Sequence, residues 1–274
     1  MQLQWNLRET IHNIFEYVIN IEIHVHCDIL AIAQWCSANL LNLNLSKTSI
    51  ISFTKRSSVT TFDYALDSMI LKRESALRDL GVLVHSKLTF KAHISNIAND
   101  ASRMLGLVMR LTKSFNTPNV FLHLYKALVL PKLDFASVSW NSCNVSNVAL
   151  LESIQRRFIR VFHDRYIRST SFYSYEYVLK KLGMSTLAYR RLIRDFTFVY
   201  NSVNAKLDCP ECLSHVPFHV PAVRTRHHRT FYIRSCQSLS PLLRTLDLAN
   251  HLCSACNIDL FCVPLSHAIQ LLHC

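Results

Sequence analysis

Residues 80–111 read LGVLVHSKLTFKAHISNIANDASRMLGLVMRL, and the spacing of their apolar residues changes part-way along. Before position 91 they form short β-prone runs at 80–84 and 88–90, separated by a polar turn. Afterwards they recur three and four positions apart, as on one face of a helix, at Ile94, Ile97, Ala98, Ala101, Leu105 and Val108. The change predicts strands followed by helices, with the boundary near Ile94.

The segments before this stretch predict one helix and several short strands. Asp28 is a candidate N-cap for a helix whose apolar face uses Ile29, Ile32, Ala33, Cys36 and Leu40, with Trp35 beside it. After position 46 the β-prone runs 50–54, 62–66 and 69–71 are separated by polar turns. We expect these runs to pair as small antiparallel hairpins.

The segments after it predict helices, then an irregular tail. Helical spacing covers 119–130, where Pro131 is expected to stop the helix, then 151–161, 175–182 ending at Gly183, and 188–203. Beyond residue 204 the prolines 210, 217, 221, 241 and 264 predict loops and short elements. The fold class is therefore expected to be α+β, with a mostly helical middle and an irregular C-terminal region.

Composition excludes several enzyme classes and favours a polyanionic partner. The 274 residues include only three glycines, too few and too dispersed for a phosphate-binding loop or a nucleophile elbow. The net charge is +12, and residues 151–200 carry ten Lys/Arg against four Asp/Glu. No apolar run suits a membrane span and no signal peptide is evident, so we expect an intracellular chain, in nucleus or cytoplasm, with no membrane partner and reduced cysteines.

A block near the N-terminus carries a family resemblance. Trp35 is followed by Asn39, then by Asn42-Leu43-Asn44, Lys47-Thr48 and the strand-like run ISFT at 51–54. This block resembles the end of the palm in the reverse transcriptases of non-LTR retrotransposons, LINE-like elements of the jockey type. Further matches follow in the family's order: LRDLGV at 77–82, LTFKAHI at 88–94, LYKALVLP at 124–131 and LESIQRRF at 151–158.

The resemblance implies an organisation and a partner. Residues 1–27 match nothing in the family, 28–93 resemble part of the palm, 94–204 the helical thumb, and 205–274 the region that follows. Leu80, Gly81 and Val82 fall in the hairpin that resembles the primer grip. Lys47 corresponds to a lysine placed near the departing pyrophosphate, although without a metal site nearby a solvated lysine is the simpler interpretation. The implied partner is an RNA/DNA template-primer duplex.

Catalytic carboxylates are not recognisable. Nucleotidyl transfer by two Mg²⁺ ions needs closely placed acids, which the family supplies partly as an Asp-Asp doublet. In this chain no two acidic residues are adjacent, and those before Trp35 are Glu9, Glu16, Glu22 and Asp28. We therefore expect no catalytic residue, no bound metal and no DNA synthesis: a fragment with the back of the palm and the thumb, without fingers or catalytic centre.

Two arginine groups are the candidate nucleic-acid contacts. Each has the same spacing, and the alternative for both is an ordinary solvated helix face. Asp195 can also pair with Arg191 and dilute the second group. The groups are Arg156, Arg157 and Arg160, and Arg190, Arg191 and Arg194.

The C-terminal cysteines offer a weaker alternative. Cys209-x2-Cys212 and Cys253-x2-Cys256 have the spacing of paired zinc ligands, but about forty residues separate them, so we expect ordinary thiols. His227-His228 reads as part of a basic loop. Besides a polymerase fragment, the sequence leaves open a non-catalytic nucleic-acid-binding or protein-interaction module derived from a transposon, or a product without function.

Overall fold

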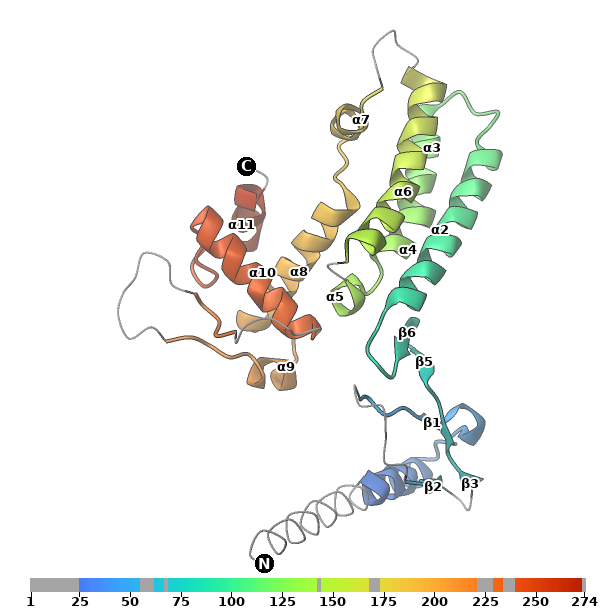
Figure 1. The fold of residues 1–274 in the computed structure, drawn as a ribbon, viewed down its shortest axis with the longest axis vertical. Helices are drawn as coiled ribbons and strands as arrows, with labels where there is room; N and C mark the ends of the chain where they lie inside the picture. The colour runs from blue at the N-terminus through green and yellow to red at the C-terminus, as the bar shows by residue number, and fades with distance from the viewer. Residues whose placement is uncertain are drawn as a thin grey trace, which may run out of the picture. The chain divides into compact units, whose positions relative to one another are not determined.

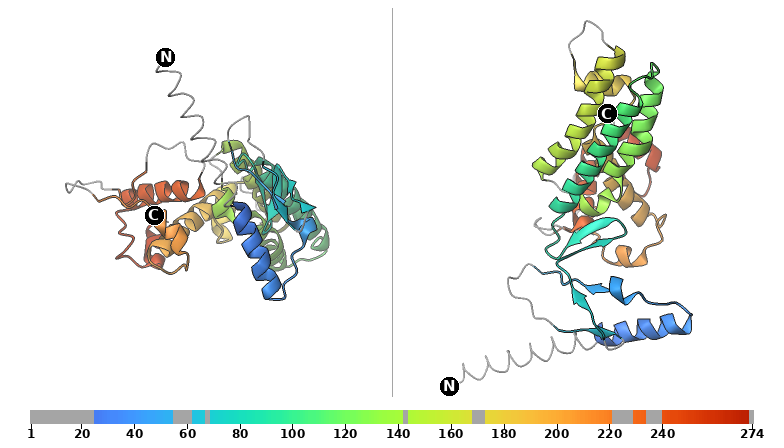
Figure 2. Two further views of the ribbon diagram at one scale, coloured as in Figure 1. Left: turned by 90° about the horizontal axis from the view of Figure 1, so that it is seen from below. Right: turned by 90° about the vertical axis from the view of Figure 1, so that its right-hand side faces the viewer.

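The computed structural model describes residues 25–54, 62–66, 69–141, 144–167, 173–220, 229–233 and 240–272 (Figures 1 and 2). The chain divides into two compact units, Met1–Thr89 and Phe90–Cys274. The first holds short strands and one helix besides a 3₁₀ turn, and the second is built of helices. The fold is therefore α+β.

The described part of unit 1 contains three two-stranded sheets. Its strands are β1 (Ser49–Ile50), β2 (Ala65–Leu66), β3 (Met69–Ile70), β4 (Lys72–Arg73), β5 (Ala76–Asp79) and β6 (Val82–His85). The β2–β3 pair is antiparallel, as expected. The β5–β6 pair is antiparallel too, but β5 is not among the predicted strands, and β1 pairs with β4 in parallel. Residues 88–90 form no strand. A parallel pair arises because β1 bonds with the strand that follows the β2–β3 hairpin.

The β5–β6 hairpin turns at Leu80 and Gly81, so the predicted strand 80–84 is wrong at its start. Asp79 pairs with Val82, which leaves a two-residue loop. Both loop residues have positive φ, 44° for Leu80 and 89° for Gly81, as a type I′ turn requires. Glycine adopts this conformation without steric cost, whereas Leu80 adopts it at a cost and is 88% exposed.

The helix of unit 1 covers residues 25–38. Asp28 lies inside it and is not its N-cap. Of the predicted apolar face, Cys36 is buried and Ile29 and Ala33 are half-buried, but Ile32 is exposed. Leu40 lies beyond the helix end, with φ 57°, and is exposed as well. The buried stripe is therefore narrower than expected.

Unit 2 begins with α2 (Lys91–Leu111), whose predicted stripe is buried apart from Ile97. A helical run then covers α3 (Pro118–Leu124), the π-helical η2 (Tyr125–Val129) and α4 (Leu130–Asp134). Pro131 does not stop this run, contrary to expectation. It lies in the first turn of α4, where its missing N–H costs little, and the wider π turn precedes it.

The centre of unit 2 is a bundle. It adds α5 (Ser137–Trp140), α6 (Val145–Phe162) with the π-helical η3 (His163–Ile167), α7 (Tyr175–Lys181) and α8 (Leu187–Val203). In Figure 1, α6 runs alongside α2, and the two helices are in contact. Phe158 of α6 stacks on Tyr125, with 3.8 Å between ring centroids. Gly183, with φ 59°, ends α7 as predicted.

The described parts of the C-terminal region pack around α8, and the 16-residue helix α10 is longer than the short elements that we expected here. It contains α9 (Pro210–Ser214), α10 (Pro241–Cys256), α11 (Leu265–Leu272) and a bridge between Phe218 and Phe231. These elements share one apolar core with α8: Phe196, Val199, Tyr200, Val216, Phe231, Leu246, Ala249, Cys253, Ile258, Leu260 and Ala268. Pro210 and Pro241 occupy first helical turns, so they start helices where we expected breaks.

Candidate nucleic-acid interface

The motif at 151–158 lies on α6, and helical periodicity places its residues on two sides of that helix, one buried and one exposed. Leu151, Glu152, Gln155 and Phe158 are buried, and the three arginines at 156, 157 and 160 are exposed. Among the described residues, none of these arginines forms a salt bridge. Together, Arg156, Arg157 and Arg160 are called the α6 arginines below.

Two of the α6 arginines lie over tyrosine rings. The guanidinium carbon of Arg156 is 5.3 Å from the ring centroid of Tyr175, and that of Arg160 is 5.5 Å from the ring centroid of Tyr173. Both are cation–π contacts, which orient a guanidinium and keep its charge in place. Arg156 and Arg160 line a groove of about 330 Å³ together with Tyr173, Ser174, Tyr175 and Glu176.

Buried hydrogen bonds fix the ring of Tyr175. Its hydroxyl donates to Glu152 Oε1 and accepts from Gln155 Nε2 at 3.1 Å. Gln155 also accepts from the Tyr125 hydroxyl at 3.2 Å, and Glu152 accepts from the backbone N–H of Leu187 at 3.1 Å. Burial, and next the hydrogen bond to Glu152, raise the pKa of Tyr175, so the phenol stays neutral. Arg156 therefore rests on a ring held by the bundle.

The second arginine group makes its contacts within the protein. Asp134, whose side chain is 2% exposed, accepts from Arg190 Nε at 3.0 Å and Nη2 at 2.7 Å. Arg194 donates to the carboxylate of Asp134 at 3.2 Å and to its backbone carbonyl at 3.1 Å. Both guanidinium groups thereby bind one buried acid, which compensates one of their two positive charges and holds both side chains against the protein.

The third member, Arg191, lies in the interior at 2% exposure. Burial lowers its pKa, while Glu152, Asp134 and Asp195 oppose the shift. The expected pairing of Asp195 with Arg191 is replaced by hydrogen bonds to Asp195 from Arg244 and, at 2.8 Å, from Asn141. The group Arg190, Arg191 and Arg194, called the α8 arginines below, is thus structural.

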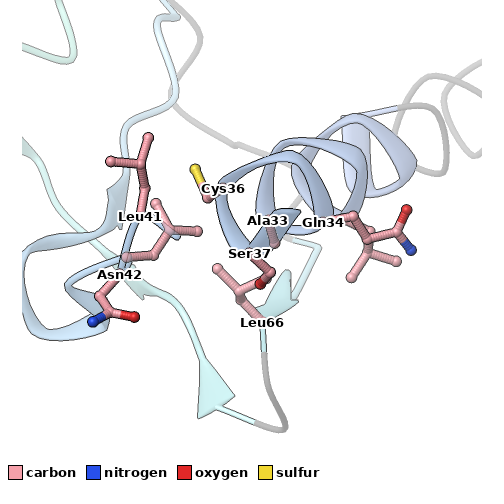
Figure 3. Close-up of a pocket in the computed structure, with 9 residues that line it drawn as sticks. Ala33, Gln34, Cys36, Ser37, Leu41, Asn42 and Leu66 are labelled. Carbon is pink, nitrogen blue, oxygen red and sulfur yellow. The ribbon is translucent and has the colours of Figure 1, made fainter. Parts of the chain in front are cut away.

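The remaining predicted residues belong to unit 1. Lys47 is exposed in the 3₁₀ turn η1 (Leu45–Lys47). Leu80 and Gly81 form the hairpin turn, and Val82, which begins β6, is buried. A hollow of about 670 Å³ lies beside the helix of this unit, where Leu41 and Asn42 face Cys36 across it (Figure 3). Its lining residues carry no charged group, so it offers no acid–base pair.

The C-terminal cysteines behave as buried or surface thiols. Cys253 belongs to the apolar core of α8 and α10, and burial raises its pKa to about 12, which disfavours the thiolate that binds metal. Within the described ranges, no three His, Cys, Asp or Glu side chains gather as a metal-binding group. The pair His227-His228 lies outside the described residues.

Sequence reasoning missed the tyrosines that support the α6 arginines. Tyr173, Tyr175 and Tyr177 alternate in the sequence just after the basic helix, and aromatics interleaved with a basic stretch are a signal for nucleic-acid binding. It also missed Asp134 and Arg244, whose roles depend on contacts between distant helices.

Comparisons of the chain with protein-family models, with curated proteins and with solved structures find no match. In the described part of the chain, no helix is both long and apolar enough to cross a membrane.

Proposed function

We propose that the chain binds the sugar-phosphate backbone of nucleic acid through the α6 arginines, as a thumb-like part of a non-LTR retrotransposon reverse transcriptase. The observation that carries this proposal is the uncompensated positive charge on the exposed side of α6. Three exposed guanidinium groups lie on one helix without a carboxylate partner among the described residues, two of them on tyrosine rings. Arginines so placed suit phosphate, which they can bind through paired N–H donors.

The order of sequence motifs supports the family assignment, and the helical unit 2 suits a thumb that holds a duplex without reading its sequence. In this proposal the exposed Lys47 corresponds to the family's lysine near the departing pyrophosphate, and the hairpin turn Leu80-Gly81, followed by Val82, corresponds to the primer grip. The expected ligand is an RNA/DNA template-primer duplex.

The test is the salt dependence of binding. Changing the α6 arginines to alanine should weaken binding and reduce the slope of log K against log salt by about 0.9 for each phosphate that is no longer bound, for B-form DNA. An RNA/DNA hybrid should show the same sign. The matched control changes Lys113, Lys126 and Lys132, three exposed cations elsewhere in unit 2. An unchanged slope in a folded triple variant would contradict the proposal, and absence of salt-dependent binding by the wild type would favour a protein-interaction module.

The proposal assigns no catalysis to this chain. Mg²⁺ supports synthesis in the family only when carboxylates hold it, and the sequence has no adjacent pair of acids. With Mg²⁺, template-primer and labelled nucleotide, the chain should incorporate no more label than an Asp28→Ala control. Incorporation that exceeds this control would overturn the non-catalytic assignment and leave the binding assignment to its own test.

A further inference from the structure

The groove beside α6 is lined by both basic and acidic side chains, unlike a purely basic surface. Arg156 and Arg160 supply positive charge one helical turn apart, and Glu176 brings a carboxylate to the same groove. Glu176 is exposed, and among the described residues it forms no salt bridge with either arginine. The groove therefore presents hydrogen-bond donors and an acceptor to the same ligand.

In the groove, an arginine covers one face of each tyrosine ring. Arg156 covers Tyr175 and Arg160 covers Tyr173, with 5.3 and 5.5 Å between guanidinium carbon and ring centroid. Tyr175 cannot turn away without breaking its bonds to Glu152 and Gln155. The arginines restrict base stacking on these faces, whereas both guanidinium groups offer N–H donors to phosphate, so we expect the ligand to be held here through its backbone.

The carboxylate of Glu176 limits which backbone fits. A carboxylate only accepts hydrogen bonds and repels the phosphate groups that the arginines attract. Within a strand, the sugar-phosphate backbone of DNA has no hydrogen-bond donor, whereas each ribose of RNA carries a 2′-hydroxyl that donates and accepts. Glu176 therefore costs affinity for DNA and has a partner in RNA.

We propose that this groove holds an RNA strand, with the arginines on phosphates and Glu176 accepting a hydrogen bond from a ribose 2′-hydroxyl. This inference rests on the proposed function and adds the identity of the strand that lies at α6. In an RNA/DNA hybrid, the groove then selects the RNA strand.

The experiment compares two hybrids of one sequence and length by fluorescence anisotropy: RNA/DNA, and 2′-O-methyl-RNA/DNA, whose 2′-oxygen cannot donate. The proteins are the full-length wild type, Glu176→Ala, and Asp208→Ala. Asp208 is an exposed acid between α8 and α9 that does not line the groove, so it controls for net charge. Circular dichroism checks that each variant is folded.

The wild type and Asp208→Ala should bind the RNA/DNA hybrid about tenfold more tightly than the methylated hybrid, the size of one charge-assisted hydrogen bond. Glu176→Ala should remove this ratio, chiefly by binding the methylated hybrid more tightly. Equal wild-type affinities, or an unchanged ratio in Glu176→Ala, would overturn the strand assignment while salt-dependent binding keeps the proposed function intact. No salt-dependent binding to either hybrid would overturn both.

Discussion

Two helices of unit 2 carry arginines at the same spacing, but the residues around the two groups differ. On α6, Arg156 and Arg160 lie over tyrosines and Arg157 is exposed. On α8, Arg190 and Arg194 bind Asp134, and Arg191 is buried among three carboxylates. What separates the two groups is the presence of a buried acid within reach.

The comparison shows why a count of basic residues overstates a binding surface. Residues 151–200 carry ten Lys/Arg, yet Arg190 and Arg194 bind Asp134, and Arg191 is buried near Glu152, Asp134 and Asp195. Burial of those acids is tolerable only with compensating cations, which ties α4, α6 and α8 together. Among the described residues of this stretch, the α6 arginines, Lys180 and Lys181 are exposed cations without a salt bridge.

The largest expected effect separates Arg191 from Arg157, the second member of each group. Arg191→Ala should lower the free energy of unfolding by about 3–5 kcal/mol, because it removes a large buried side chain and a positive charge that faces Glu152, Asp134 and Asp195. Arg157→Ala, at an exposed site, should change it by less than about 0.5 kcal/mol. Urea unfolding followed by circular dichroism measures both. Equal decreases in stability would mean that the two groups are not different in kind.

A smaller loss of stability is expected at Tyr175, the ring over which Arg156 lies. Tyr175→Phe keeps the ring under Arg156 but removes the hydroxyl that bonds Glu152 and Gln155, and should cost about 1–3 kcal/mol of unfolding free energy. Tyr177→Phe, on the same helix and exposed, is the matched control. Similar stability of the two variants would show that the hydrogen bonds of the Tyr175 hydroxyl do not stabilise this part of the bundle.

Asp195, on α8, should make the free energy of unfolding depend on pH. Burial raises the pKa of Asp195 from 3.8, although Arg244 and Asn141 oppose it. The folded state therefore binds this proton more tightly, and the resulting stability is complete below 3.8 and disappears as pH rises through the folded pKa. The unfolding free energy of the wild type minus that of Asp195→Asn should fall over this range, and Arg157→Ala should follow the wild type. A difference that grows with pH would reverse the assigned direction.

The smallest effect concerns Tyr173, which contacts Arg160 from outside the bundle core. Tyr173→Leu removes a cation–π contact worth about 0.5–1 kcal/mol at an exposed site, so hybrid binding should weaken about two- to fivefold. The reason is that a freer guanidinium loses more conformational entropy when it binds phosphate. Anisotropy titrations at one salt concentration measure the change. Unaltered affinity would show that the ring does not prepare Arg160 for binding.

Periodicity alone predicted much of the helical unit, because α2, α6, α7 and α8 bury one apolar stripe each. It failed where one residue type occurs in two different local structures. Pro131 and Pro241 lie in first helical turns, and Leu80 adopts a positive φ that leucine rarely takes. The roles of the α8 arginines depend on Asp134 and Arg244, more than forty residues away from them in sequence, so no local pattern could separate the two groups.

The most direct test of the central claim is arginine modification by phenylglyoxal, read by mass spectrometry for the chain alone and bound to an RNA/DNA hybrid. In the free chain, Arg156, Arg157 and Arg160 should react, whereas Arg191 should not, because it is 2% exposed. Bound hybrid should protect the α6 arginines and leave Arg103, an exposed arginine on α2, reactive. Modification of the α6 arginines that is unchanged when the hybrid binds would contradict the account.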